Sequence, residues 1–167
     1  NSFIYTASRG YLDHHAIERI VPGNWVDVSY TAFGKKECRY LIPNEFELNP
    51  DVEPLDSHPG SVCMGGYGEA GLAGCEFFFP LRDCPDHKGI YPVFGRVLEG
   101  MDEVYRLEKV ETVPVTDFPI EGVEVNRPVR PEIIERVELE LYGAVYPEPV
   151  RVREPELPEC WKDEAAE

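Results

Sequence analysis

Basic side chains are scarce in this chain of 167 residues. It carries 16 lysines and arginines against 32 aspartates and glutamates, which gives a formal net charge of −16 at pH 7. Phosphate backbones and anionic lipid surfaces are bound by basic faces of proteins. The sequence therefore predicts no nucleic-acid partner and no membrane partner. A surface this acidic favours solubility or a basic partner.

Patterns typical of metal sites and disulfide frameworks are also absent. The five cysteines are an odd number without a C-x-x-C pair, and the four histidines lack the spacing of metal ligands. We therefore expect reduced, mostly buried cysteines, no metal and no cofactor. Reduced cysteines favour a cytoplasmic location. The first residue is Asn1 rather than Met, which leaves export open.

No stretch approaches the roughly 18 apolar residues of a membrane span. What is present is an ordinary globular composition, with 43% hydrophobic and 29% charged residues. Short apolar or alternating stretches, split by glycine and proline, predict strands. They lie at residues 16–21, 25–30, 40–42, 61–65, 77–81, 93–98 and 133–141.

Helical spacing of apolar residues is confined to two places. Residues 1–8 read as the end of a helix, and a second helix begins at Gly100. Residues 112–131 contain three prolines before Arg130 and are predicted to be a loop. Many short strands with few helices predict a mainly β fold, a closed antiparallel β-barrel with capping helices.

Three motifs follow one another in a fixed order. The first is Ala-Ile-Glu-Arg-Ile-Val-Pro-Gly at 16–23, the second is Gly-Cys-Glu-Phe-Phe-Phe at 74–79, and the third is Phe-Gly-Arg-Val-Leu-Glu-Gly-Met-Asp at 94–102. Together they resemble the cyclophilins, the barrel family of peptidyl-prolyl isomerases. The third motif is the most specific match, and its role in the family is structural. The resemblance covers roughly residues 1–143.

The resemblance implies a cofactor-independent isomerase of Xaa-Pro bonds, with Arg19 as the principal catalytic residue. The chemistry agrees with this role. Rotation about the peptide bond has a barrier of about 20 kcal/mol, and no covalent step is needed to lower it. The twisted amide loses resonance, so its nitrogen becomes a better hydrogen-bond acceptor. An arginine stays charged and presents a rigid set of donors.

Further residues are implied to bind the substrate. Phe78 matches the aromatic residue that floors the proline pocket in the family. Phe77 and Phe79 should face the opposite side of the strand, because side chains alternate along it. Gly65 and Gly66 match the family's short stretch that binds a peptide through main-chain hydrogen bonds.

The sequence departs from the family at several of these positions. Asp27 and Glu76 stand where the family has glutamines, and Trp25 replaces a lost wall of the pocket. The family's tryptophan and histidine beyond the aromatic strand have no clear counterparts, and their positions fall near Asp86 and Tyr91. Carboxylates beside Arg19 would hold its guanidinium and partly neutralise it, and they would favour a basic side chain in the bound peptide.

Two functions stay open at this point. The first is an isomerase acting on proline-containing peptides or proteins. The second is a catalytically weak cyclophilin-fold module that binds such peptides. A hydrolase or metalloenzyme on a similar barrel lacks support, because no order of nucleophile, base and acid is visible.

The ends of the chain carry two further expectations. Family members begin with two strands that have no counterpart here, so residues 1–143 form a barrel without its usual first two strands. A separate chain supplying them, a segment outside these residues, and the C-terminal tail are the three explanations left open. Residues 144–167 are rich in proline and acidic side chains, which predicts a tail or a strap rather than a domain.

Overall fold

The computed structural model describes residues 1–28, 35–118 and 120–152 of the chain. Short strands dominate it, with few helices, so the predicted mainly β fold is confirmed. The helices are α1 (Ser2–Ser8), α3 (Glu45–Leu48) and α4 (Met101–Leu107), and 3-10 turns form at η1 (Lys36–Cys38), η2 (Gly68–Ala70) and η3 (Pro85–His87).

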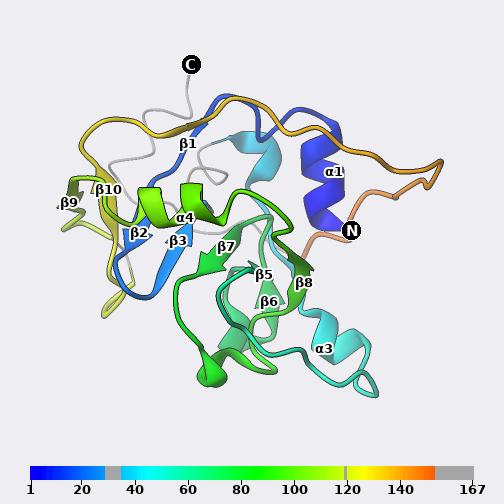
Figure 1. The fold of residues 1–167 in the computed structure, drawn as a ribbon. Coiled ribbons are helices and arrows are strands. Elements are labelled where there is room, and N and C mark those ends of the chain that lie inside the picture. Colours follow the sequence, from blue (N-terminus) through cyan, green and yellow to red (C-terminus); the bar gives the residue numbers. More distant parts are fainter. Residues whose placement is uncertain (29–34, 119, 153–167) are drawn as a thin grey trace.

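The strands follow the chain in this order (Figure 1). They are β1 (His15–Ala16), β2 (Arg19–Val21), β3 (Trp25–Asp27), β4 (Ile42–Pro43), β5 (Ser61–Met64), β6 (Leu72–Ala73), β7 (Phe77–Pro80), β8 (Val93–Arg96), β9 (Thr112–Pro114), β10 (Asn126–Pro128) and β11 (Ile133–Ile134).

The central element is a five-stranded antiparallel sheet in the order β2-β3-β7-β5-β8. Its register places Arg19 opposite Asp27, and Asp27 opposite Phe78. Directly opposed residues share a face of a sheet, and so do residues two apart along one strand. Arg19, Asp27 and Phe78 therefore lie on one face, together with Trp25.

The opposite face of this sheet forms the core. Phe77 packs edge-to-face against Phe79, with ring centroids 5.8 Å apart, and against Phe3 of α1 at 5.2 Å. Val104 and Leu107 of α4 belong to the same buried cluster. The prediction that Phe77 and Phe79 share a face opposite to Phe78 is confirmed.

The predicted loop at 112–131 is wrong. Strands β9 and β10 pair antiparallel within it, with Thr112 opposite Pro128 and Pro114 opposite Asn126. Figure 1 shows this ladder at one side of the molecule. Pro114 and Pro128 are the last residues of β9 and β10, where a missing N–H costs little, so they do not prevent pairing.

Other predicted boundaries shift where pairing partners are short. The expected strand at 133–141 shrinks to β11, because its partner β1 is only two residues long. The expected strand at 25–30 ends at Asp27 as β3, and residues 29–34 lie outside the described part of the chain. Helix α3 was not predicted. The Asn44 side chain caps it by accepting a hydrogen bond from the Phe46 N–H at 3.2 Å.

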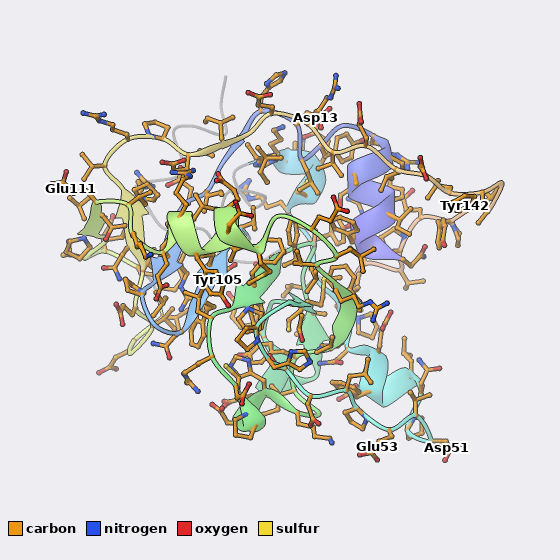
Figure 2. All side chains as sticks on the ribbon, viewed as in Figure 1. Asp13, Asp51, Glu53, Tyr105, Glu111 and Tyr142 are labelled. Atoms are coloured by element: carbon orange, nitrogen blue, oxygen red, sulfur yellow. The ribbon has the colours of Figure 1, made fainter. Side chains whose placement is uncertain are left out.

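The beginning of the predicted tail contacts the body of the molecule. The Val152 N–H donates to the Leu41 carbonyl at 2.7 Å, and the guanidinium of Arg151 lies 4.5 Å from the ring centroid of Tyr40. Residues 153–167 lie outside the described part. Acidic side chains such as Asp51, Glu53 and Glu111 project from the surface (Figure 2).

Four of the five cysteines fall in the described residues, and all of them are buried free thiols: Cys38, Cys63, Cys75 and Cys84. This agrees with the predicted mostly buried cysteines, while Cys160 lies outside the described part. None of the described helices has the length and apolar character to cross a bilayer.

Candidate active site

A cavity of about 500 Å³ lies on the face of the central sheet that carries Arg19, Asp27 and Phe78. Strands β2, β3 and β7 supply one side of it, and the loops that follow β5 and η3 supply the other. All residues predicted to form the site line this one cavity: Arg19, Trp25, Asp27, Gly65, Gly66, Glu76, Phe78 and Tyr91.

Arg19 is held from two directions at the charged end of the cavity. Its Nη1 donates to Asp27 Oδ2 at 2.8 Å, and its Nε donates to the Glu124 carbonyl at 2.7 Å. The two side chains of the ion pair are only 11% and 8% exposed. The guanidinium also lies 5.4 Å from the ring centroid of Trp25. These contacts fix its position, because a charge-assisted bond is strong when shielded from water.

Glu76 is the second carboxyl at this end, and it is 4% exposed. Its Oε2 has no hydrogen-bond partner among the described residues. Burial raises the pKa of Glu76 well above its ordinary value, repulsion from Asp27 adds to the increase, and Arg19 opposes it. Burial and the neighbouring Asp27 therefore both favour the protonated, neutral form of this carboxyl.

The Glu76 side chain fits because two glycines leave room for it. A Cβ atom at Gly65 would lie 2.8 Å from Glu76 Cγ, and one at Gly74 would lie 3.0 Å from the same atom. The Gly65 N–H donates to the Glu76 carbonyl at 3.0 Å, and the Gly65 carbonyl accepts from the Gly74 N–H at 2.9 Å. Both main-chain groups of Gly65 are thus engaged within the protein. Of the predicted pair, this leaves Gly66 as the better candidate for a main-chain contact with a peptide.

Gly66 has a specific reason to be glycine. Its φ is 125°, and a Cβ atom would lie 2.6 Å from the Gly74 backbone nitrogen. No other residue type fits this close approach without moving the backbone.

The other end of the cavity is an aromatic cluster. His87 lies 5.5 Å from the Trp25 ring, 5.5 Å from Phe78 and 4.9 Å from Tyr91, measured between centroids. Phe78 and Tyr91 meet edge-to-face at 5.8 Å. Burial lowers the pKa of His87, with nearby Asp86 acting in the opposite direction. The rings of Trp25, Phe78 and Tyr91 therefore form an aromatic wall around the imidazole, whose neutral form is favoured by burial.

His87 was not predicted from the sequence, which placed the family's tryptophan and histidine positions near Asp86 and Tyr91. Tyr91 does line the cavity, whereas Asp86 is exposed. Both Asp86 and His87 lie in the 3-10 turn η3, which begins at Pro85. Three residues make one turn of such a helix, so only one of the three faces the sheet. Pro85, at the first position of η3, was the sequence feature that could have indicated this turn.

Two loops complete the rim and were not predicted to do so. Tyr67, Gly68, Glu69 and Ala70 come from the segment around η2, and Ile120, Glu121 and Val123 come from the connection between β9 and β10. Within the described ranges, no three His, Cys, Asp or Glu side chains are grouped so that they could hold a metal ion.

Comparison with known proteins places the chain in a family. The family model for cyclophilin type peptidyl-prolyl cis-trans isomerase/CLD matches residues 1–148. The chain belongs to this family. A peptidyl-prolyl cis-trans isomerase of Arabidopsis thaliana is 33% identical over 129 residues, which cover 75% of this chain and 76% of the relative.

Two further comparisons concern a much longer relative and a solved structure of low sequence identity. The human "Peptidylprolyl isomerase domain and WD repeat-containing protein 1" is 28% identical over 127 residues, which cover 74% of this chain but only 19% of that protein. A cyclophilin type isomerase from Cryptosporidium parvum, solved in the presence of the dipeptide Ala-Pro, superimposes with a TM-score of 0.61 at 18% identity. That superposition covers 81% of this chain and 80% of the solved one, and it supports the cyclophilin fold.

Proposed function

We propose that this cyclophilin catalyses cis–trans isomerisation of Xaa-Pro bonds in proteins, with Arg19 as its catalytic residue. The observation that carries the proposal is the position of Arg19, which is fixed at one end of a cavity whose other end is a wall of aromatic rings. The site thus offers an apolar surface for a proline ring and a fixed cation beside it.

In this mechanism the proline ring packs against Trp25, Phe78 and Tyr91. The amide bond before the proline then lies toward Arg19. Rotation removes the amide resonance and leaves a lone pair on the nitrogen, which the guanidinium stabilises by hydrogen bonding and charge. A donor aimed at charge that develops in the transition state contributes about 3 kcal/mol in other enzymes.

The ion pair of Arg19 with Asp27 favours a second candidate, a module that binds proline-containing peptides with little turnover. A carboxylate 2.8 Å from the guanidinium neutralises part of its charge in a buried setting. The transition state would then gain less from Arg19, while the aromatic wall would still bind proline. Asp27 is therefore the residue that separates the two candidates.

The test is an isomerisation assay, by exchange spectroscopy, on a blocked peptide with one Ala-Pro bond. We expect Arg19→Ala to lower kcat/KM by about 100-fold, and Arg106→Ala, a matched arginine on α4, to leave it unchanged. A wild-type protein that binds the peptide without accelerating exchange would establish the binding module. Equal activity of wild type and Arg19→Ala would remove Arg19 from the mechanism.

We also propose that the strands close into a barrel when a further pair of strands joins them, supplied by a separate chain or by a segment outside these residues. The outer strands β2 and β8 of the central sheet support this. So does a second cavity of about 400 Å³ on the core side, lined by apolar residues that include Phe3, Phe79 and Val137. Slow hydrogen exchange at the outer edge of β8 is expected only in the closed form.

A further inference from the structure

Carboxyl groups outnumber cations around the candidate active site. The described residues that line the cavity include four acidic ones: Asp27, Glu69, Glu76 and Glu121. Apart from His87, whose pKa is lowered by burial, the basic residue among them is Arg19. Asp27 is paired with Arg19. Glu69 and Glu121 are exposed on the rim, one from the η2 segment and one from the connection between β9 and β10. Exposed carboxylates alone do not make a site, because solvent screens them.

Glu76 supplies the independent observation. It is 96% buried and lines the cavity, and its Oε2, itself shielded from solvent, has no hydrogen-bond partner among the described residues. A buried polar atom left unpaired costs free energy, about 1–3 kcal/mol in other proteins. A ligand that supplies a donor at this position would remove that cost.

Glu69, Glu76 and Tyr91 line the same cavity. Burial raises the pKa of the Tyr91 hydroxyl, and the charge of Glu69 raises it further. Tyr91 also belongs to the aromatic wall, since its ring contacts Phe78 and His87. The acidic groups therefore adjoin the surface assigned to the proline ring.

We propose that Glu76, assisted by Glu69, forms a subsite for a lysine or arginine side chain that flanks the proline of the substrate. This inference rests on the proposed function, because it assumes that a proline occupies the aromatic wall. It narrows the substrate class to Xaa-Pro segments with a neighbouring basic residue. The strongly acidic surface would favour the approach of such segments.

A cation is preferred over a neutral donor because of the groups that face Glu76. Asp27 on β3 and Arg19 on β2 are its charged neighbours, and Tyr91 and Glu69 line the same cavity from the loops. Arg19 is already paired with Asp27, so an ionised Glu76 would not have a cation of its own before a ligand binds. An arriving ammonium or guanidinium provides one, so Glu76 gives up its proton to solvent as the ion pair forms.

The test uses peptides that differ only in charge. Lysine or its neutral isostere norleucine is placed in turn at the two positions before the proline and the one after it. Binding is measured by calorimetry at about pH 6, in two buffers with different ionisation enthalpies. At one position we expect the lysine peptide to bind about tenfold tighter than the norleucine peptide, and to release about one proton.

Two variants separate the buried carboxyl from the rim. In Glu76→Gln the ratio of the lysine to the norleucine affinity should fall close to one, and proton release should vanish. In the matched variant Glu121→Gln, which changes an exposed rim carboxylate, both should persist. A lysine preference that survives Glu76→Gln and disappears in high salt would overturn the proposal in favour of general attraction to an acidic rim.

The outcomes also distinguish a failure of the cation subsite from a failure of the proposed isomerase function. If lysine and norleucine peptides bind equally well at every position, the cation subsite is refuted while the proline site stands. If neither peptide binds nor undergoes accelerated isomerisation, the proposed function fails, and the subsite fails with it.

Discussion

The two ends of the cavity satisfy their side chains in different ways. At the aromatic end, Phe78, His87 and Tyr91 pack mainly against one another, with centroids 4.9–5.8 Å apart. At the charged end, Arg19 has a partner in Asp27, whereas Glu76 Oε2 has none among the described residues. At the aromatic end, Trp25 Nε1 and His87 Nδ1 are also buried without a hydrogen-bond partner among these residues. The two ends therefore differ in the kind of group left unpaired, because only the charged end leaves a carboxyl oxygen without a partner.

This difference separates binding from selectivity. The hydrophobic effect is non-directional and roughly proportional to the apolar area buried, so the aromatic end should hold any proline of suitable shape. Hydrogen bonds and charges depend on position and on protonation, so the charged end should decide which proline-containing segment is favoured. Both ends nevertheless share one property, because burial shifts the pKa of Glu76 and that of His87 in the direction that favours the neutral side chain.

The largest expected effect comes from removing the aromatic end. Phe78 is 5% exposed, and Phe78→Ala should lower the free energy of unfolding by about 3 kcal/mol, because it leaves a cavity in a packed cluster. It should also abolish binding of the Ala-Pro peptide at protein concentrations where the variant is still folded. Urea denaturation and calorimetry measure the two quantities.

The neighbouring residue offers a matched control for this change. Phe79 lies on the opposite face of β7 and contacts Phe77 at 5.8 Å. Phe79→Ala should therefore destabilise the fold and leave peptide binding intact. Equal losses of binding in both variants would show that general destabilisation, and not the loss of the wall, weakens binding.

The same two ends show what the sequence could predict. The alternation of side chains along the predicted strand at 77–81 was enough to put Phe78 on one face and Phe77 and Phe79 on the other. Local sequence patterns cannot predict which loops, distant in the sequence, contact the cavity. The connection between β9 and β10 reaches the cavity because those strands pair, and their pairing was hidden by prolines at the strand ends.

His87 and the protonation of Glu76 illustrate a second limit. The cavity position of His87 depends on the phase of a short 3-10 turn, which matching positions along the sequence could not give, and the expected position fell near Asp86. The sequence showed a carboxyl at position 76, but its protonation depends on how many atoms surround it. Burial is a property of the folded packing, so the predicted clamp of charged carboxylates became one ion pair and one carboxyl whose neutral form is favoured.

Glu76 should give the next largest effect, through the dependence of stability on pH. The pKa of Glu76 is higher in the folded protein than in the unfolded chain. The protonated side chain therefore does not destabilise the fold below its ordinary pKa, and the free energy of unfolding falls as the pH rises from there toward the folded pKa. The difference in unfolding free energy between wild type and Glu76→Gln should change by up to about 1.4 kcal/mol per pH unit in that window. Urea denaturation from pH 5 to 8 measures it, and parallel curves for the two proteins would contradict a protonated Glu76.

His87 should give the smallest effect, with the opposite sign. Its folded pKa lies below the ordinary value of 6.5, so its contribution to stability is present above that value and is lost as the pH falls below it. His87→Phe keeps a ring in the wall and should change stability at pH 8 by less than about 1.5 kcal/mol. On acidification from pH 7 to pH 5, the variant should lose less stability than the wild type in urea denaturation. If both proteins lose the same amount, the imidazole accepts its proton in the folded state, and the aromatic end is not the water-excluding wall that binding of a proline ring requires.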